Sequence, residues 1–205
     1  MPSKHRPSVV VLAGPNGAGK STTAADLLRG ALGVTEFVNP DLISQGLSVF
    51  EPERVAMAAG RVMLRRIHEL GRERVNFAFE TTLASRSFAP WLAKLRDAGY
   101  RVHVVFLWLP GVELAIARVK DRVRRGGHNV PEEHIRRRYV SGLRNFFRLY
   151  QPLASTWQFL DNSGDPPPRM IARGRGRRVT GVADRTTWQQ IMEGYSHGKS
   201  RDEGY

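Results

Sequence analysis

Hydrophobic residues along this chain occur in two patterns: short unbroken runs, and longer stretches in which they recur every three or four positions. Unbroken runs of four to eight residues are typical of strands buried on both faces, and the longer spacing is typical of helices with one buried side. The runs predict strands at 8–13, 35–38, 74–79, 101–109 and 156–161. The longer stretches predict helices at 19–29, 52–70, 86–98, 111–125 and 131–149.

Strand and helix alternate through most of the chain. This alternation predicts an α/β fold with a five-stranded, mainly parallel sheet and helices on both of its faces. In such folds ligands bind at the carboxyl ends of the strands. The segments of interest are therefore those that directly follow strands: 14–21, 39–41 and 80–82.

A proline-rich break at 164–168 separates the alternating part from a basic C-terminal region. We expect a core at 1–165 and an appendage at 166–195. The last residues, 196–205, are polar and are expected to be disordered. Within the appendage the pattern predicts a small hairpin made of 169–173 and 178–182, followed by a helix over 184–195 with Asp184 as its N-cap.

Residues Gly14–Ser21 read Gly-Pro-Asn-Gly-Ala-Gly-Lys-Ser and follow the first expected strand. This is the phosphate-binding pattern G-x-x-x-x-G-K-[ST] at a strand-to-helix junction, the P-loop. Glycines let the backbone N–H groups surround a phosphate, Lys20 supplies a positive charge, and the Ser21 hydroxyl is a ligand for Mg²⁺. The pattern predicts that the chain binds ATP and Mg²⁺. The expected nucleotide-binding residues are Gly14, Asn16, Gly17, Ala18, Gly19, Lys20, Ser21 and Thr22.

Asp41 follows the second expected strand through Asn39 and Pro40. A carboxylate in this place would face the terminal phosphate and could accept the proton of an attacking hydroxyl, as phosphoryl transfer requires. The alternative is structural, with Asp41 as the N-cap of a short helix. The residues alone leave these two interpretations equally favoured.

Glu80, Thr81 and Thr82 end the third expected strand. A carboxylate at that edge can hold Mg²⁺ through its water shell or bind substrate hydroxyls, and the threonines can bind a phosphate or a sugar. The structural alternative is a strand-end cap. A carboxylate at a buried strand is costly unless it is paired or bound to a metal, which favours the functional interpretation.

Arginines concentrate between 111 and 149, a region that we interpret as a helical lid with a glycine hinge at Gly126-Gly127. Arg118, Arg122 and Arg125 form one stripe of the first lid helix and could stabilise the charge of a transferring phosphoryl group. A solvated basic face is the alternative. Three further arginines, Arg137, Arg144 and Arg148, lie opposite the apolar stripe of the second helix and could equally be surface residues.

Asn39 and His128 complete the expected substrate-side residues. His128 directly follows the glycine hinge, and the structural alternative is that it caps that hinge. A single histidine is weak support for a binding role.

The formal net charge of +13 indicates attraction to polyanions, among them nucleotides, nucleic acid, acidic lipid surfaces and acidic proteins. The chain has no cysteine, which excludes disulfides and thiolate metal sites. It has no apolar stretch of the length of a membrane span. A soluble cytoplasmic protein is therefore expected, with no membrane partner and with nucleic acid as a less favoured partner.

Taken together, these motifs resemble the zeta-toxin family of P-loop kinases, and within it the short bacterial proteins described as predicted kinases or ATPases. The resemblance runs from Val9 to Asn162 and includes Asn-Pro-Asp at 39–41, Phe-Glu-Thr-Thr-Leu at 79–83, and Arg-Val-Lys-Asp-Arg-Val-Arg-Arg-Gly-Gly-His at 118–128. It implies ATP- and Mg²⁺-dependent phosphorylation of a hydroxyl, with a UDP-linked amino sugar as substrate in the better-understood members. A small antitoxin protein is a further partner that the resemblance implies.

Carried over by position, Lys20 and Ser21 would hold ATP and Mg²⁺, and Asp41 would be the base. Glu80 and Thr82 would contact substrate, and Arg118 with Arg122 or Arg125 would contact the phosphates. The larger toxins have a second acidic residue two positions before the base, where this chain has Asn39, and a His-Pro pair that is missing here. The sugar-nucleotide substrate is the part of the resemblance that these differences affect.

Three hypotheses follow for the function. The first is a small-molecule kinase, in which Asp41 deprotonates a hydroxyl of the acceptor. The second is a kinase whose acceptor is a nucleotide or a nucleic-acid end, as the positive charge suggests. The third is a binding module that is gated by ATP and regulates a partner.

Overall fold

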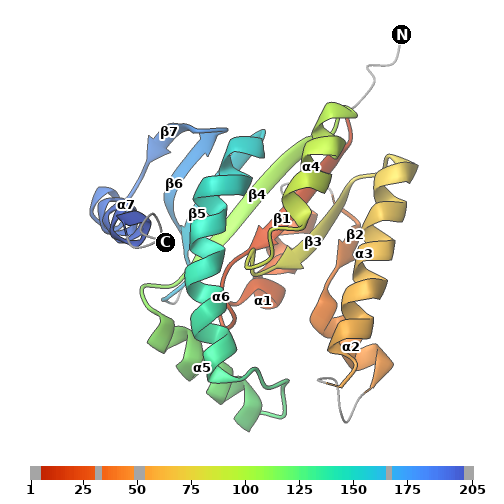
Figure 1. Ribbon diagram of the computed structural model, residues 1–205, viewed down its shortest axis with the longest axis horizontal. Coiled ribbons are helices and arrows are strands. Elements are labelled where there is room, and N and C mark those ends of the chain that lie inside the picture. The colour runs from red at the N-terminus through yellow and green to blue at the C-terminus, as the bar shows by residue number, and fades with distance from the viewer. Residues whose placement is uncertain (1–5, 31–33, 49–53, 165–167, 201–205) are drawn as a thin grey trace.

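The computed structural model describes residues 6–30, 34–48, 54–164 and 168–200. Within them, seven strands form one sheet with the order β2-β3-β1-β4-β5-β6-β7 (Figure 1). The strands are β1 (Ser8–Ala13), β2 (Glu36–Val38), β3 (Phe77–Thr81), β4 (Arg101–Trp108), β5 (Thr156–Asp161), β6 (Arg169–Arg175) and β7 (Arg178–Val182).

The helices connect and cover these strands, and all except α2 lie close to the ranges that the hydrophobic spacing predicts. They are α1 (Lys20–Ala25), α2 (Pro40–Leu47), α3 (Ala56–Glu73), α4 (Phe88–Asp97), α5 (Val112–Arg124), α6 (Glu132–Asn145) and α7 (Arg185–Ser200). A π-helical turn, Asp26–Gly30, continues α1, and another, Phe146–Tyr150, continues α6. A 3₁₀ turn, Gln151–Leu153, then leads to β5.

Strands β1 to β5 are parallel, as expected, but the expectation of five strands is wrong. β6 pairs antiparallel with β5, and β7 pairs antiparallel with β6. The hairpin is therefore an extension of the same sheet. Its Ile171 and Ala172 are buried, and Ala172 lies opposite Phe159 of β5. The sequence does not indicate this pairing. The proline-rich break separates the two strands of the hairpin from β5, so the hairpin looks like a separate unit.

The sheet is buried on both faces, which explains the unbroken apolar runs. On one face, Val10, Leu12 and Leu107 pack with apolar residues of α1 and α5. On the other face, Val9, Val11 and other alternate strand residues pack with α3, α4, the end of α6 and α7. Successive residues of a strand point to opposite faces, so each central strand must be apolar throughout.

Helix α7 packs against the apolar core on the second face of the sheet. Its expected N-cap is confirmed, because the Thr187 backbone N–H donates to Asp184 Oδ1 at 3.0 Å. Trp188 stacks on Trp157 with ring centroids 5.8 Å apart. The helix continues to Ser200, into the 196–205 segment expected to be disordered, and 201–205 lie outside the described residues. The division at residue 165 stays a prediction.

No helix in the described part of the chain has the length and apolar character that crossing a membrane requires.

Helix α6 passes very close to the segment that follows β3. A Cβ at Gly142 would collide with the carbonyl oxygen of Thr82. One turn further along α6, Asn145 Nδ2 donates to the carbonyl oxygens of Leu83 at 2.8 Å and Ala84 at 3.0 Å. The close approach and the two hydrogen bonds hold the segment after β3 against α6.

We expect Gly142→Ala to lower the stability of the protein by about 1–3 kcal/mol, because the added methyl group must push α6 away from the Thr82 carbonyl. The matched control is Gly60→Ala in α3, where an added Cβ meets nothing within 4 Å. That change should be neutral or stabilise by up to about 1 kcal/mol through helix propensity. Thermal unfolding measures both. Equal midpoints for the two variants would contradict the close contact.

Candidate functional site

The P-loop joins β1 to α1 in a conformation that requires its glycines. Gly14, Gly17 and Gly19 have φ angles of 143°, 77° and 75°, in a region that side chains rarely adopt. A Cβ at Gly17 would lie 2.7 Å from the Ala115 carbonyl oxygen of α5. The loop is thus packed closely against α5, and α1 begins directly after it at Lys20. This is the geometry in which N–H groups at a helix start bind phosphate.

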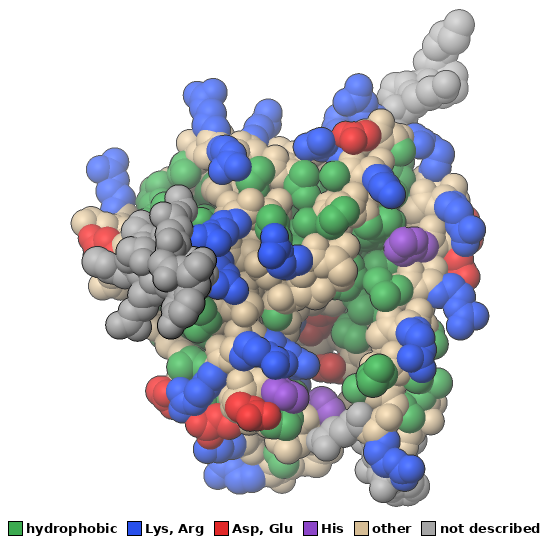
Figure 2. Space-filling view, viewed as in Figure 1, with side chains coloured by type: hydrophobic (Ala, Val, Ile, Leu, Met, Phe, Trp, Pro, Cys, Tyr) green, Lys and Arg blue, Asp and Glu red, His purple; other side chains and the backbone are tan. Residues whose placement is uncertain are grey.

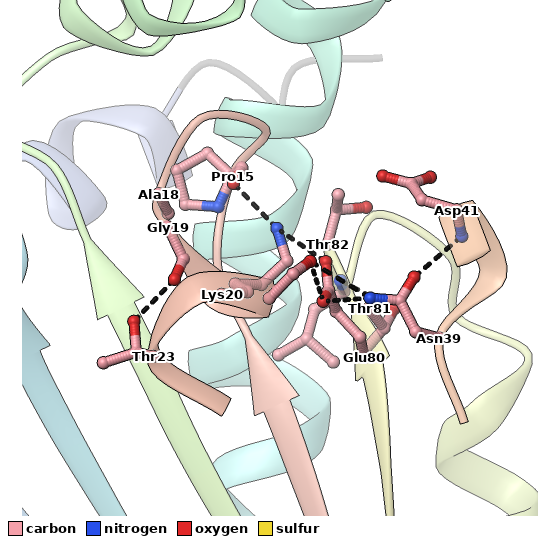
Figure 3. Close-up of polar contacts among 12 residues, drawn as sticks. Pro15, Ala18, Gly19, Lys20, Thr23, Asn39, Asp41, Glu80, Thr81 and Thr82 are labelled. Carbon is pink, nitrogen blue, oxygen red and sulfur yellow. Dashed lines mark hydrogen bonds and ion pairs between the residues drawn. The ribbon is translucent and has the colours of Figure 1, made fainter. Parts of the chain in front are cut away.

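Side chains from the start of α1 and from the ends of β2 and β3 meet in a hydrogen-bonded cluster, which we call the Glu80 cluster: Lys20, Ser21, Asn39 and Glu80 (Figure 3). Glu80 Oε2 accepts from Ser21 Oγ at 2.8 Å and from Asn39 Nδ2 at 2.8 Å. Glu80 Oε1 lies 3.6 Å from Lys20 Nζ. The sequence places these residues up to 60 positions apart, and the parallel register of the three strands brings them together.

Lys20 is held in a dry environment. Its side chain is only 6% exposed, and Nζ donates to the Pro15 carbonyl oxygen at 2.9 Å. Burial lowers the pKa of Lys20, and the nearby carboxylates of Glu80 and Asp41 oppose this effect. A buried ammonium group next to the loop gains strongly from an added anion, as a phosphate would be.

Asn39, and not Asp41, caps α2. Asn39 Oδ1 accepts from the backbone N–H of Asp41 at 2.8 Å and of Leu42 at 3.2 Å, and Pro40 is the first helical residue. The capping role for Asp41 is therefore wrong. Its side chain is 39% exposed and points back toward Thr82 and the P-loop (Figure 3). The carboxylate is thus held at the site by the backbone of α2 and is open to a ligand.

Two arginines of the lid region lie near Asp41. Arg122 Nη1 is 3.8 Å from Asp41 Oδ2, while Arg122 Nη2 donates to the His128 carbonyl oxygen at 2.7 Å. Arg122 Nε is buried without a hydrogen-bond partner among the described residues. Arg138 of α6 also senses the Asp41 charge: burial lowers the pKa of Arg138, Arg137 lowers it further, and Asp41 raises it.

The other two expected arginines lie in different places. Arg118 donates to the carbonyl oxygens of Asn162 at 2.7 Å and Ser163 at 2.9 Å, at the end of β5 beside the P-loop. The Arg125 side chain is 79% exposed and pairs with Asp121 of its own helix at 2.8 Å. The structure brings Arg118 and Arg122 to the site. It places Arg125 on the outer surface, as the alternative interpretation of a solvated basic face predicts.

The two threonines after Glu80 shape the turn that follows β3. Thr81 Oγ1 accepts from the Leu83 N–H at 3.1 Å, and Thr82 Oγ1 accepts from the Ala84 N–H at 3.4 Å. Leu83 has a φ of 56° although it carries a side chain, and it is fully buried. This conformation costs free energy and persists only where the surroundings hold it. The contacts from α6 described above provide that hold.

The helices of the expected lid are packed on the body of the protein in this structure. Ala115, Ile116 and Val119 of α5 are buried in the core, and the Tyr139 hydroxyl of α6 donates to the Leu109 carbonyl oxygen at 2.7 Å. Arg136 of α6 joins the two helices through Glu113 of α5 at 2.6 Å. Closure of these helices over a ligand stays a prediction.

The cluster opens into a hollow on the face shown in Figure 2, where acidic side chains are visible inside and Lys, Arg and His side chains lie at the rim. No group of three or more His, Asp or Glu side chains that could hold a metal occurs in the described ranges. The Ser21 hydroxyl and the Glu80 carboxylate nevertheless fit Mg²⁺, because this ion takes few protein oxygens and completes its shell with water and phosphate. The loop also contains a buried acceptor, Asn16 Oδ1, with no partner among the described residues.

Sequence reasoning missed three residues that build the site. Asn162 Nδ2 donates to the Ala18 carbonyl oxygen at 2.7 Å and so ties the end of β5 to the P-loop. Arg138 lies in a run of three arginines in which no spacing rule distinguishes it. Asn145 could have been recognised from the sequence, because a polar residue beside Phe146 and Phe147 in a buried helix needs a hydrogen-bond partner.

Comparison with known proteins gives one family and several structures of the same fold. A family model described as an AAA domain matches residues 9–139. An uncharacterized protein of Haemophilus influenzae is 29% identical over 126 residues, which are 62% of this chain and 88% of that protein.

Among solved structures, the AvrRxo1-ORF1:AvrRxo1-ORF2 complex with sulphate ions has a TM-score of 0.71 at 18% identity, over 91% of this chain and 63% of that chain. The same complex has also been solved with ATP. The chain thus spans less than two thirds of that relative. A structure of the PezAT chromosomal toxin–antitoxin system of Streptococcus pneumoniae has a TM-score of 0.62 at 13% identity, over 99% of this chain and 90% of that chain.

These structural likenesses are at low sequence identity, so they show a common P-loop α/β fold. The family match is stronger, because it spans more than half of the chain and includes the P-loop and the Glu80 cluster. The chain belongs to the AAA domain family.

Proposed function

We propose that the protein is an ATP-dependent phosphotransferase that moves the γ-phosphoryl group of ATP to a hydroxyl group of an acceptor. The observation that carries this proposal is the placement of Asp41. Its carboxylate points toward a P-loop whose lysine is buried, and it belongs to the strand end next to the Glu80 cluster. An accessible carboxylate at this point favours transfer to a hydroxyl group, because a general base is required there.

The phosphates would be bound by the P-loop backbone and by Lys20. The positive-φ glycines aim N–H groups into the loop, and the buried Lys20 ammonium group would gain an anionic partner. Arg122, whose Nε lies buried without a partner among the described residues, would stabilise charge on the transferring group. The AvrRxo1 complex with ATP is consistent with nucleotide binding by this fold.

Ser21 and Glu80 would hold Mg²⁺, Ser21 through its hydroxyl and Glu80 directly or through water. When bound, the ion supplies positive charge that offsets the charge of the phosphates. Asn39 keeps the Glu80 carboxylate in place by donating to it, and it donates to Ser21 Oγ at 3.0 Å as well.

Asp41 would act as the general base. It accepts the proton of the acceptor hydroxyl as that oxygen bonds to the γ-phosphorus, and the bond from this phosphorus to the β-phosphate oxygen breaks to release ADP. Arg122 Nη1 lies 3.8 Å from Asp41 Oδ2, so the guanidinium group can help to orient the carboxylate toward the acceptor.

For the acceptor we propose a small hydroxyl compound, with a UDP-linked amino sugar as the specific candidate from the zeta-toxin resemblance. The fold shared with the PezAT structure supports this direction, and it supports a small antitoxin protein as a partner. Asn39 replaces the acidic residue of the larger toxins, and the structure assigns it to the Glu80 cluster. An amide there donates a hydrogen bond that a carboxylate could not, so the acceptor side of this site differs from theirs.

The direct test incubates the purified protein with ATP, Mg²⁺ and a bacterial metabolite extract, and searches by mass spectrometry for compounds that gain one phosphoryl group. A product that depends on ATP and protein supports the proposal. If no extract component, UDP-linked amino sugars included, is phosphorylated while ATP binds tightly, the transferase function is wrong and the ATP-gated binding module is favoured.

We expect Asp41→Asn to keep ATP affinity and to lower the rate of transfer by about 10²–10⁴-fold, because the amide cannot accept the proton. The matched control is Asp97→Asn, whose carboxylate pairs with Arg96 on the surface of α4 at 3.1 Å. Calorimetry measures ATP binding, and the phosphorylated product measures the rate. A variant at position 41 that works at nearly the wild-type rate would refute the base assignment.

We expect Glu80→Gln to raise the Mg²⁺ concentration needed for half-maximal activity at least several-fold, because a neutral amide is a poorer partner for the ion and its water. The amide oxygen can still accept from Asn39 and Ser21, but the ion pair with the buried Lys20 is lost, so thermal unfolding must establish that the variant is folded. The control is Glu69→Gln, which removes a carboxylate 3.7 Å from Arg66 on α3. An unchanged Mg²⁺ dependence would remove Glu80 from the metal site.

A further inference from the structure

A second candidate site lies away from the P-loop, in a groove between α3 and α4. It has a volume of about 600 Å³, and its floor is apolar, made by Leu64, Trp91 and Leu95 with Gly71 and Ala98. Gly71 allows the two helices to approach, since a Cβ there would lie 3.1 Å from Leu95 Cδ2. In Figure 2, Lys and Arg side chains border hydrophobic ones over α3 and α4.

The walls of this groove are cationic. Arg65 and Arg72 of α3 and Lys94 of α4 line it, and no carboxylate does. All three side chains are exposed, and none has an ion-pair partner in the part of the chain that the structure describes. The two arginines are seven residues apart, which is about 10 Å along a helix. Cations at this spacing can contact more than one phosphate of an extended strand.

The acidic side chains nearest in sequence are Glu69, Glu73 and Asp97, and none of them pairs with a groove cation in the described part of the chain. Glu69 lies 3.7 Å from Arg66 on another side of α3, and Asp97 pairs with Arg96 at 3.1 Å. The three groove cations are therefore not neutralised locally. Their charges add to a formal net charge of +13, which attracts polyanions to the whole molecule.

An aromatic surface completes the groove. His68 of α3 stacks on Trp91 of α4, with ring centroids 5.1 Å apart and planes 12° from parallel. His68 is exposed, so the face of its ring that is turned away from Trp91 is accessible. Trp91 is fixed from behind by Phe77 and Phe79 of β3, with ring centroids at 6.1 Å and 5.9 Å. The pair is a rigid platform of stacked rings between the cations.

We propose that this groove binds single-stranded nucleic acid, with phosphates on Arg65, Arg72 and Lys94 and a base stacked on His68. Proteins that bind single strands combine a cationic groove with aromatic side chains on which bases stack. A double strand cannot use the platform, because its bases are already stacked on one another. An acidic peptide could use the cations but gains nothing from the ring stack.

The proposal does not depend on the phosphotransferase activity, since the groove residues belong to α3 and α4 and take no part in the Glu80 cluster. The C-terminal hairpin is the competing basic surface, with Arg175 and Arg178 exposed on β6 and β7. A groove of about 430 Å³ lies beside β7 and is lined by Arg185 and Trp188, but Arg175 and Arg178 do not line it. The two hairpin arginines therefore provide a control in which the same number of charges is reversed outside the proposed groove.

The experiment measures binding of a fluorescein-labelled 20-nucleotide oligo(dT) by fluorescence anisotropy at several salt concentrations. Two charge-reversal variants are compared with wild type: Arg65→Glu with Lys94→Glu in the groove, and Arg175→Glu with Arg178→Glu in the hairpin. We expect at least tenfold weaker binding for the groove variant and less than threefold for the hairpin variant. The slope of the logarithm of the binding constant against the logarithm of the salt concentration should become smaller in magnitude by about one to two for the groove variant.

His68→Ala tests the stacking separately, because it leaves the charged residues in place. We expect binding of oligo(dT) to weaken about 5- to 10-fold, in the range for one lost stacking contact. Affinity for poly-glutamate of similar charge should stay unchanged. Circular dichroism and thermal unfolding establish that each variant is folded. If the variant with Arg65→Glu and Lys94→Glu is not folded, Arg65→Gln with Lys94→Gln replaces it.

Three results would overturn the proposal. Equal losses in the groove and hairpin variants would mean that only net charge matters. A larger loss in the hairpin variant would place the polyanion there. Poly-glutamate that binds the groove as tightly as oligo(dT), with no effect of His68→Ala on either, would indicate an acidic protein partner.

Discussion

The Glu80 carboxylate is the group on which the arrangement of the site depends. It ends a buried strand and its side chain is only 8% exposed, so it must be paired and hydrogen-bonded. Removing the partner of such a buried charge typically costs about 3–5 kcal/mol. Its two oxygens are satisfied by Lys20 and Ser21 at the start of α1 and by Asn39 after β2. Satisfying one carboxylate thus fixes the relative positions of the P-loop, the start of α2 and the end of β3.

Asn39 shows how this constraint reaches the proposed catalytic residue. Its amide nitrogen donates to Glu80 and Ser21, while its oxygen caps α2. The direction of α2, and with it the position of Asp41 in its first turn, is therefore tied to the same carboxylate. From the other side, α6 holds the segment after Glu80 through Gly142 and Asn145. The P-loop, Asp41 and the segment after β3 are in this way held in fixed positions relative to one another.

Much of the fold could be predicted from the sequence, because parallel strands buried on both faces leave unbroken apolar runs between amphipathic helices. The predicted number of strands was wrong because the hairpin also belongs to the sheet. Its pairing with β5 depends on contacts across a proline-rich break. The P-loop could be read from its residues alone, since its glycines answer a local backbone requirement. The roles of Asn39 and Asn162 could not, because each depends on a partner in another element. Arg125 shares a stripe with Arg122, yet only a three-dimensional structure shows that one faces Asp41 and the other faces solvent.

The most direct measurement of the central claim is a crystal structure of the protein with Mg²⁺ and a nonhydrolysable ATP analogue. We expect the terminal phosphate against Lys20 Nζ, the ion on Ser21, and the Asp41 carboxylate across from that phosphate with room for one hydroxyl group between them. An Asp41 side chain turned away from the terminal phosphate, out of reach even through one water molecule, would contradict it.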